Sequence, residues 1–109
     1  MADILTKAID TATAASNELV APVTGKRVRV YGLWIQAAGT VTLTFEDDDG
    51  TNLAGAIVLN ARETVEWFPI SNGQGEWLPY LVTQKGDGFH MLLGGAIQVS
   101  GTLWYSQGD

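Results

Sequence analysis

Residues 40–46, with the sequence TVTLTFE, alternate strictly between polar and apolar side chains, and no other feature constrains the fold as much. In an extended chain Val41, Leu43 and Phe45 point to one side, whereas the threonines and Glu46 point to the other. This two-residue period is typical of a β-strand that has one buried and one solvated face. We therefore predict a strand here, in a sheet that covers one side of the core.

Further short segments with strand character follow along the chain, and many of them end at one of its 13 glycines. We expect them near residues 7–13, 18–22, 26–37, 56–60, 63–68, 77–85, 89–93 and 97–106. Short strands at such spacing are typical of β-sandwiches and barrels. We predict one all-β domain over residues 1–109, a jelly-roll-like antiparallel β-sandwich of about eight strands.

Residues 26–37 contain two apolar sets of opposite parity, because Val28 and Val30 precede Gly32 whereas Leu33 and Ile35 follow it. One strand cannot bury both sets on one face. We expect either a β-bulge at Gly32 or a second half that is covered on both sides. The short turn after this strand predicts that residues 26–37 and 40–46 form a hairpin.

The N-terminal segment, residues 1–16, fits either a first strand or a mobile N-terminal arm. Its apolar residues also fit a helical stripe, but its threonines favour a strand. We expect this strand to be followed by a turn at Ser16-Asn17.

Net charge and cysteine content exclude several classes of function. The twelve acidic and six basic residues give a net charge of −6, which argues against binding to nucleic acid or to an anionic membrane. No apolar run reaches the ~18 residues that a membrane span needs, and the first residues do not resemble a signal peptide. The absence of cysteine excludes disulfides and thiolate chemistry.

Four consecutive acidic residues, Glu46 to Asp49, precede Gly50 and raise the question of a metal site. The run fails the EF-hand pattern, because the glycine follows the acids directly and the twelfth position from Asp47 is Val58. In an extended chain Asp47 and Asp49 face one way and Asp48 the other. We expect the exposed tip of a hairpin, with Asp49-Gly50 as its turn. A weak surface calcium site is the alternative, and we predict no metal and no cofactor.

Residues suited to catalysis do not form a recognisable motif. The glutamates that could form a carboxylate pair are Glu46, Glu63, Glu66 and Glu76. His90 is the only histidine, and no G-x-S-x-G elbow accompanies it. We therefore predict no catalytic residues and no enzymatic activity.

Four tryptophans, Trp34, Trp67, Trp77 and Trp104, are the candidate interface residues. Trp34 and Trp104 fall on the polar parity of their strands, where a large apolar ring suggests contact with another molecule. A protein interface and a sugar-stacking platform are both open, as is a structural role at the edges of the core.

The segment 25–55 resembles a group of small virion proteins of tailed phages. The group shares a Gly-Lys-Arg strand start, a Val-Thr-x-x-Phe strand and a closing Leu-x-Gly. The matching residues are Gly25, Lys26, Arg27, Arg29, Val30, Gly39, Val41, Thr42, Phe45, Leu53 and Gly55. The closing segment 92–105 is also similar, whereas residues 60–81 depart from the pattern.

The resemblance implies a jelly-roll module that serves as a structural part of the virion and is made in the host cytoplasm. Capsid decoration (cement), a head-fibre base and a tail adaptor are the roles it suggests, and we expect decoration. The expected partners are further copies in a homotrimer and the major capsid or another virion protein, without nucleic acid or membrane. A carbohydrate- or receptor-binding module that uses its tryptophans is the alternative.

Overall fold

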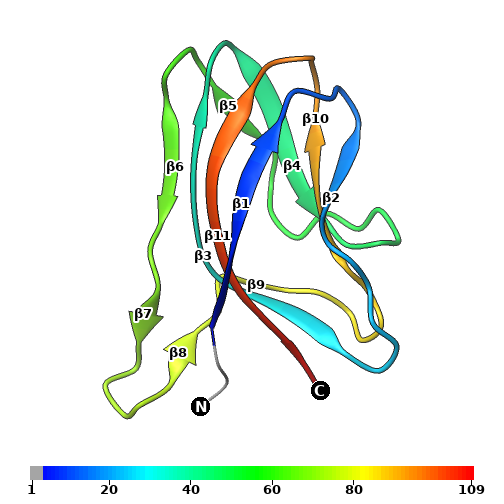
Figure 1. Ribbon diagram of the computed structural model, residues 1–109, viewed down its shortest axis with the longest axis vertical. Coiled ribbons are helices and arrows are strands. Elements are labelled where there is room, and N and C mark those ends of the chain that lie inside the picture. The colour runs from blue at the N-terminus through cyan, green and yellow to red at the C-terminus, as the bar shows by residue number, and fades with distance from the viewer. Residues whose placement is uncertain (1–3) are drawn as a thin grey trace.

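The computed structural model describes residues 4–109, and within that range it contains β-strands and no helix (Figure 1). The strands are β1 (Leu5–Thr11), β2 (Ser16–Val20), β3 (Arg27–Ala37), β4 (Val41–Glu46), β5 (Ile57–Leu59), β6 (Thr64–Trp67), β7 (Ile70–Ser71), β8 (Trp77–Leu78), β9 (Leu81–Val82), β10 (Phe89–Leu93) and β11 (Val99–Gly108). The expectation of an all-β chain is confirmed.

Two antiparallel sheets pack face to face. One has the order β1-β11-β3-β6, with β9 also paired to β3, and the other has the order β2-β10-β4-β5. The first strand pairs with the last, β2 with β10, β3 with β6 and β4 with β5, so successive pairs alternate between the sheets. This nested pairing is the jelly-roll topology of eight strands. The short strands β7, β8 and β9 are inserted between β6 and β10.

The core lies between the two sheets, and Val41, Leu43 and Phe45 are buried as predicted, although Thr44 on the other face is buried as well. Leu43 and Phe45 are fully buried in β4, and they face Leu33 and Ile35 of β3, which are also fully buried. The Phe45 ring stacks on Phe89 with centroids 5.6 Å apart. Burial on facing inner surfaces supplies the main driving force for this arrangement.

A bulge in β3 explains its two apolar sets. Trp104 of β11 lies opposite Gly32, but the next residue, Tyr105, lies opposite Val30, so Tyr31 is unpaired. The extra residue switches the parity, and Val30 and Leu33 on either side of it both face the core. Of the two alternatives that the sequence left open, the structure therefore shows the bulge.

The predicted hairpin between residues 26–37 and 40–46 is wrong, because β3 and β4 lie in opposite sheets. The turn carries the chain across the sandwich, and the Ala38 amide donates to the Gln98 carbonyl. Gly39 allows a close approach there, since a Cβ at this position would lie 3.2 Å from Ile97 Cδ1. A turn signal fixes where the chain bends but not which strand lies beside which.

At the N-terminus, β1 pairs with β11 over its whole length, from Leu5↔Tyr105 to Thr11↔Val99. The turn falls at residues 12–15, and the expected turn residues Ser16 and Asn17 instead begin β2. The side-chain nitrogen of Asn17, Nδ2, donates to the backbone carbonyls of Thr13 and Ala15, at 3.1 and 2.9 Å. Asn17 thus stabilises the turn from within the strand.

Candidate functional site

Trp34 and Trp104 lie on the outer face of the β1-β11-β3-β6 sheet, as their parity predicted. Trp34 pairs with Thr102 and Trp104 pairs with Gly32, so the two tryptophans are diagonal neighbours on adjacent strands. Both are half-buried. Trp104 packs over Gly32, where a Cβ would lie 3.0 Å from the indole ring. The glycine therefore provides room for the ring on the outer face of the sheet.

Trp67 and Trp77 have different surroundings, so the four tryptophans do not form one platform. Trp67 points inward from β6 and packs on the core against Phe45, with ring centroids 5.6 Å apart. Its other neighbour is the Tyr80 ring, which stacks on it at 5.5 Å. Trp77 lies on β8 and pairs with Ser71. Trp67 therefore has the structural role at the core edge that the sequence left open.

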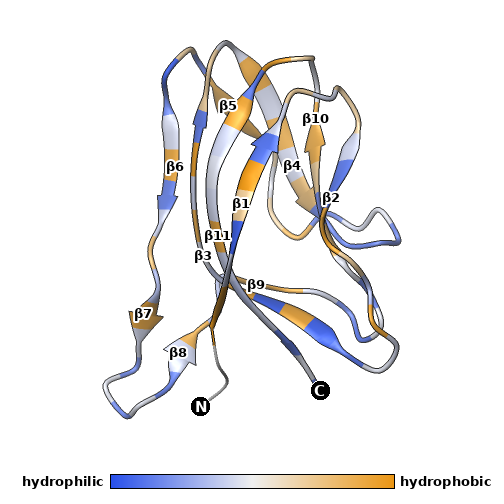
Figure 2. Ribbon diagram, viewed as in Figure 1, coloured by the Kyte–Doolittle hydropathy of each residue, from blue (hydrophilic) through white to orange (hydrophobic). Residues whose placement is uncertain are grey.

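Several exposed large apolar side chains lie together around the short ribbon of β7 and β8. We define the ribbon surface as Phe68, Ile70, Leu78 and Tyr80, which are exposed by 52, 49, 41 and 39%. Ile70 and Leu78 are cross-strand partners, so their side chains lie next to each other. The ribbon projects from the sandwich and carries hydrophobic colour on β7, behind its polar tip (Figure 2).

Local contacts hold the base of the ribbon in place. The Tyr80 hydroxyl donates to the Phe68 carbonyl at 2.9 Å, and the Phe68 ring meets the Trp104 ring edge-on at 6.2 Å. At its tip the Asn72 side chain accepts the Gln74 amide, and Gly73 and Gly75 adopt positive φ. These contacts position the ribbon but leave its apolar side chains uncovered. Sequence reasoning missed the ribbon surface, because Pro69 and Pro79 interrupt the alternation that would have indicated it.

The acidic run forms the tip of a turn between β4 and β5, as expected. Glu46 and Asn52 form an isolated antiparallel β-bridge through their backbones. Between them the Gly50 amide donates to the Asp47 carbonyl, and Gly50 has a φ of 77°. The expectation that all the acids are exposed is wrong for Asp47, which is only 2% exposed. Its Oδ1 accepts the amides of Asp49 and Thr51 at 3.0 and 3.1 Å. This side chain therefore organises the turn from inside.

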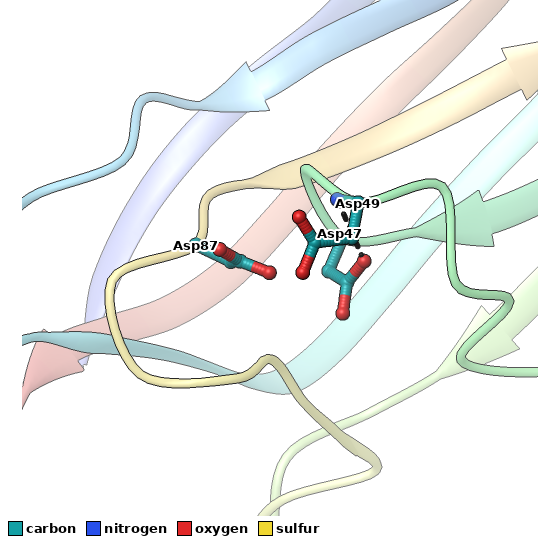
Figure 3. Close-up of side chains that lie close together, drawn as sticks. All are labelled: Asp47, Asp49 and Asp87. Atoms are coloured by element: carbon teal, nitrogen blue, oxygen red, sulfur yellow. Dashed lines mark hydrogen bonds between the residues drawn. The ribbon is translucent and has the colours of Figure 1, made fainter.

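A third aspartate, Asp87 of the β9–β10 loop, reaches the same place (Figure 3). One carboxylate oxygen from each of Asp47, Asp49 and Asp87 lies within 4.8 Å of the other two. Partial burial, followed by the charges of Asp49 and Asp47, raises the pKa of the Asp87 carboxyl. Sequence reasoning did not find Asp87, which lies far from the acidic run along the chain.

Asp48 points elsewhere and pairs with His90, whose Nε2 lies 2.6 Å from Asp48 Oδ1. Ser16 Oγ lies 3.4 Å from His90 Nδ1, so the three residues have the composition of a Ser-His-Asp triad. The same hydroxyl is 3.4 Å from Glu46 Oε1, a carboxylate that would repel an oxyanion developing at this place. The geometry fits a surface ion pair better than an activated nucleophile.

Comparisons with protein-family models, with curated proteins and with solved structures gave no match for this chain. The resemblance to phage virion proteins therefore rests on its sequence motifs. In the part of the chain that the structure describes, there is no helix with the length and hydropathy to cross a membrane.

Proposed function

We propose that this chain is a non-enzymatic structural component of a tailed-phage particle, a capsid decoration protein that binds the assembled shell as an oligomer. The observation that carries the proposal is the ribbon surface. Ile70 and Leu78 leave about half of their side-chain area in water, on an element that projects from an otherwise well-packed sandwich. Apolar side chains presented in this way are typical of a protein–protein contact.

The ribbon is also suited to a contact by its size. Each of its strands has two residues, and an isolated two-stranded ribbon is marginally stable in water. A partner that covers Ile70 and Leu78 would bind through this apolar burial and would at the same time stabilise the folded ribbon. We assign this surface to the shell, because a projecting element reaches a neighbouring subunit while the sandwich stays outside. The sequence motifs supply the virion context.

Co-sedimentation with undecorated phage heads tests the proposal. We expect the purified protein to pellet with the heads in a saturable manner, because a lattice of equivalent sites makes even weak single contacts persistent. Light scattering on the free protein should give the mass of a homotrimer. A monomeric mass together with no pelleting at saturating protein would exclude shell decoration.

Trp34 and Trp104 favour a second candidate, a carbohydrate- or receptor-binding module. Both rings are half-exposed on one sheet face, and flat aromatic faces of this kind stack on sugar rings. A glycan array followed by titration of tryptophan fluorescence tests this function. Saturable quenching would support this function if Trp34→Ala lowers the affinity for the glycan at least about tenfold, the equivalent of ~1.4 kcal/mol. No response on the array and in the titration would reject it.

A further inference from the structure

We propose that Asp47, Asp49 and Asp87 form a calcium-binding site between the β4–β5 turn and the β9–β10 loop. The site is distinct from the ribbon surface and does not depend on the proposed role in a virion. Calcium binds six to eight oxygen ligands, for which carboxylates are the preferred side chains. Asp47 Oδ1 is already engaged by two amides, so the three carboxylates supply up to five oxygens, and water or backbone carbonyls can complete the shell.

Two oxygens of this cluster are buried without a hydrogen-bond partner, and they are independent evidence for a ligand. Asp47 Oδ1 accepts two amides, but Asp47 Oδ2 accepts none, although the residue is 98% buried. Asp87 Oδ2 is likewise buried and unpartnered. An unpaired buried carboxylate oxygen is costly, so such atoms call for a positive partner.

The protein itself supplies little positive charge here. Among residues 4–109 the ion pairs join Lys26 to Asp109 and His90 to Asp48, and neither pair includes a member of the cluster. The pairing with His90 holds Asp48 outside it. Three carboxylates therefore lie close together, and none of them is paired with a basic side chain in the described part of the chain.

The loop that presents Asp87 is anchored before any ion binds. The Thr83 hydroxyl donates to the Asp87 carbonyl at 3.1 Å and accepts the Val28 amide at 3.0 Å. Gly88 allows a close approach to β2, because a Cβ there would lie 2.3 Å from the Val20 carbonyl oxygen. A loop held in this way loses little entropy on binding an ion.

The donor set favours calcium over magnesium. One oxygen from each of the three carboxylates lies within 4.8 Å of the other two, close enough for all three to bind one ion. Calcium accepts a flexible shell of six to eight oxygens, whereas magnesium requires near-ideal octahedral geometry and gives up its water reluctantly. Three carboxylates that differ in burial and come from two loops therefore suit calcium better.

Titration of the EDTA-treated full chain with calcium chloride tests the site, by calorimetry and by thermal unfolding. We expect saturable binding with a Kd of about 10⁻⁵–10⁻³ M. Calcium at ten times the Kd should raise the Tm by about 5 °C or more. Magnesium chloride should bind at least about tenfold more weakly. Failure of the wild-type protein to bind calcium at about 10 mM would overturn the proposal.

Asp87→Asn and Asp49→Asn are the diagnostic variants, because both residues are less buried than Asp47 and their loss should leave the fold intact. Each should weaken calcium binding at least about tenfold. Without calcium, Asp87→Asn should melt at or above the wild-type temperature, because it removes like-charge repulsion. Glu76→Gln removes the same charge from an exposed loop and should bind calcium like the wild type. Unchanged affinity in Asp87→Asn would show that the cluster is not the site.

Discussion

Gly101→Ala is expected to destabilise the domain by about 3–5 kcal/mol, because the position has no room for a side chain. A Cβ at Gly101 would lie 1.7 Å from the Trp34 carbonyl oxygen and 2.8 Å from Ile35 Cα. Both atoms belong to the backbone of β3, which pairs with strands on both of its edges and cannot move away alone. A loss of this size is a large share of the 5–15 kcal/mol that stabilises a typical domain.

Urea unfolding followed by circular dichroism measures the effect, with Gly108→Ala as the matched control. Gly108 lies in the same strand, but a Cβ there would have no heavy atom within 4 Å. The control should therefore stay within about 0.5 kcal/mol of the wild-type protein. Equal stability of the two variants would mean that β3 and β11 do not approach as closely as the structure has them.

Periodicity in the sequence predicted the buried side of β4 and the bulge in β3, because both depend on neighbours along one strand. Val41, Leu43 and Phe45 share a parity, and the parity switch around Gly32 left two alternatives, of which the structure shows the bulge. Strand parity does not explain the acidic run, because residues 47–50 form a turn and are not extended. Asp47 and Asp49 lie together in the cluster, whereas Asp48 lies beside His90.

Features that depend on tertiary contacts could not be predicted in this way. The turn after Ala37 reads like a hairpin, but a short turn can also carry the chain to the opposite sheet, and the strands that pair with β3 and β4 come from elsewhere in the chain. Asp87 joins the acidic turn because the β9–β10 loop passes from one sheet to the other. Its setting, Gly86-Asp87-Gly88, indicates a tight loop but not what the loop approaches.

Replacing both Ile70 and Leu78 by threonine is expected to abolish binding to phage heads while preserving the fold. The two side chains are cross-strand partners at the centre of the ribbon surface, and threonine keeps the strand propensity that the ribbon needs. Losing even one hot-spot residue costs 2 kcal/mol or more, a weakening of about 30-fold. In a lattice each lost contact also lowers the avidity of the oligomer, so retention on the heads should fall below detection.

The measurement is co-sedimentation over a range of protein concentrations, with Val58→Thr as the control. Val58 is 64% exposed and lies on β5, in the other sheet, so its replacement removes apolar surface away from the ribbon. Both variants should melt within a few degrees of the wild-type protein, since the replaced side chains are exposed. Loss of pelleting in the ribbon variant alone would locate the shell contact. If the ribbon variant pellets as well as the wild-type protein, the shell contact lies on another face of the molecule. The outer face with Trp34 and Trp104 would then be the next to test.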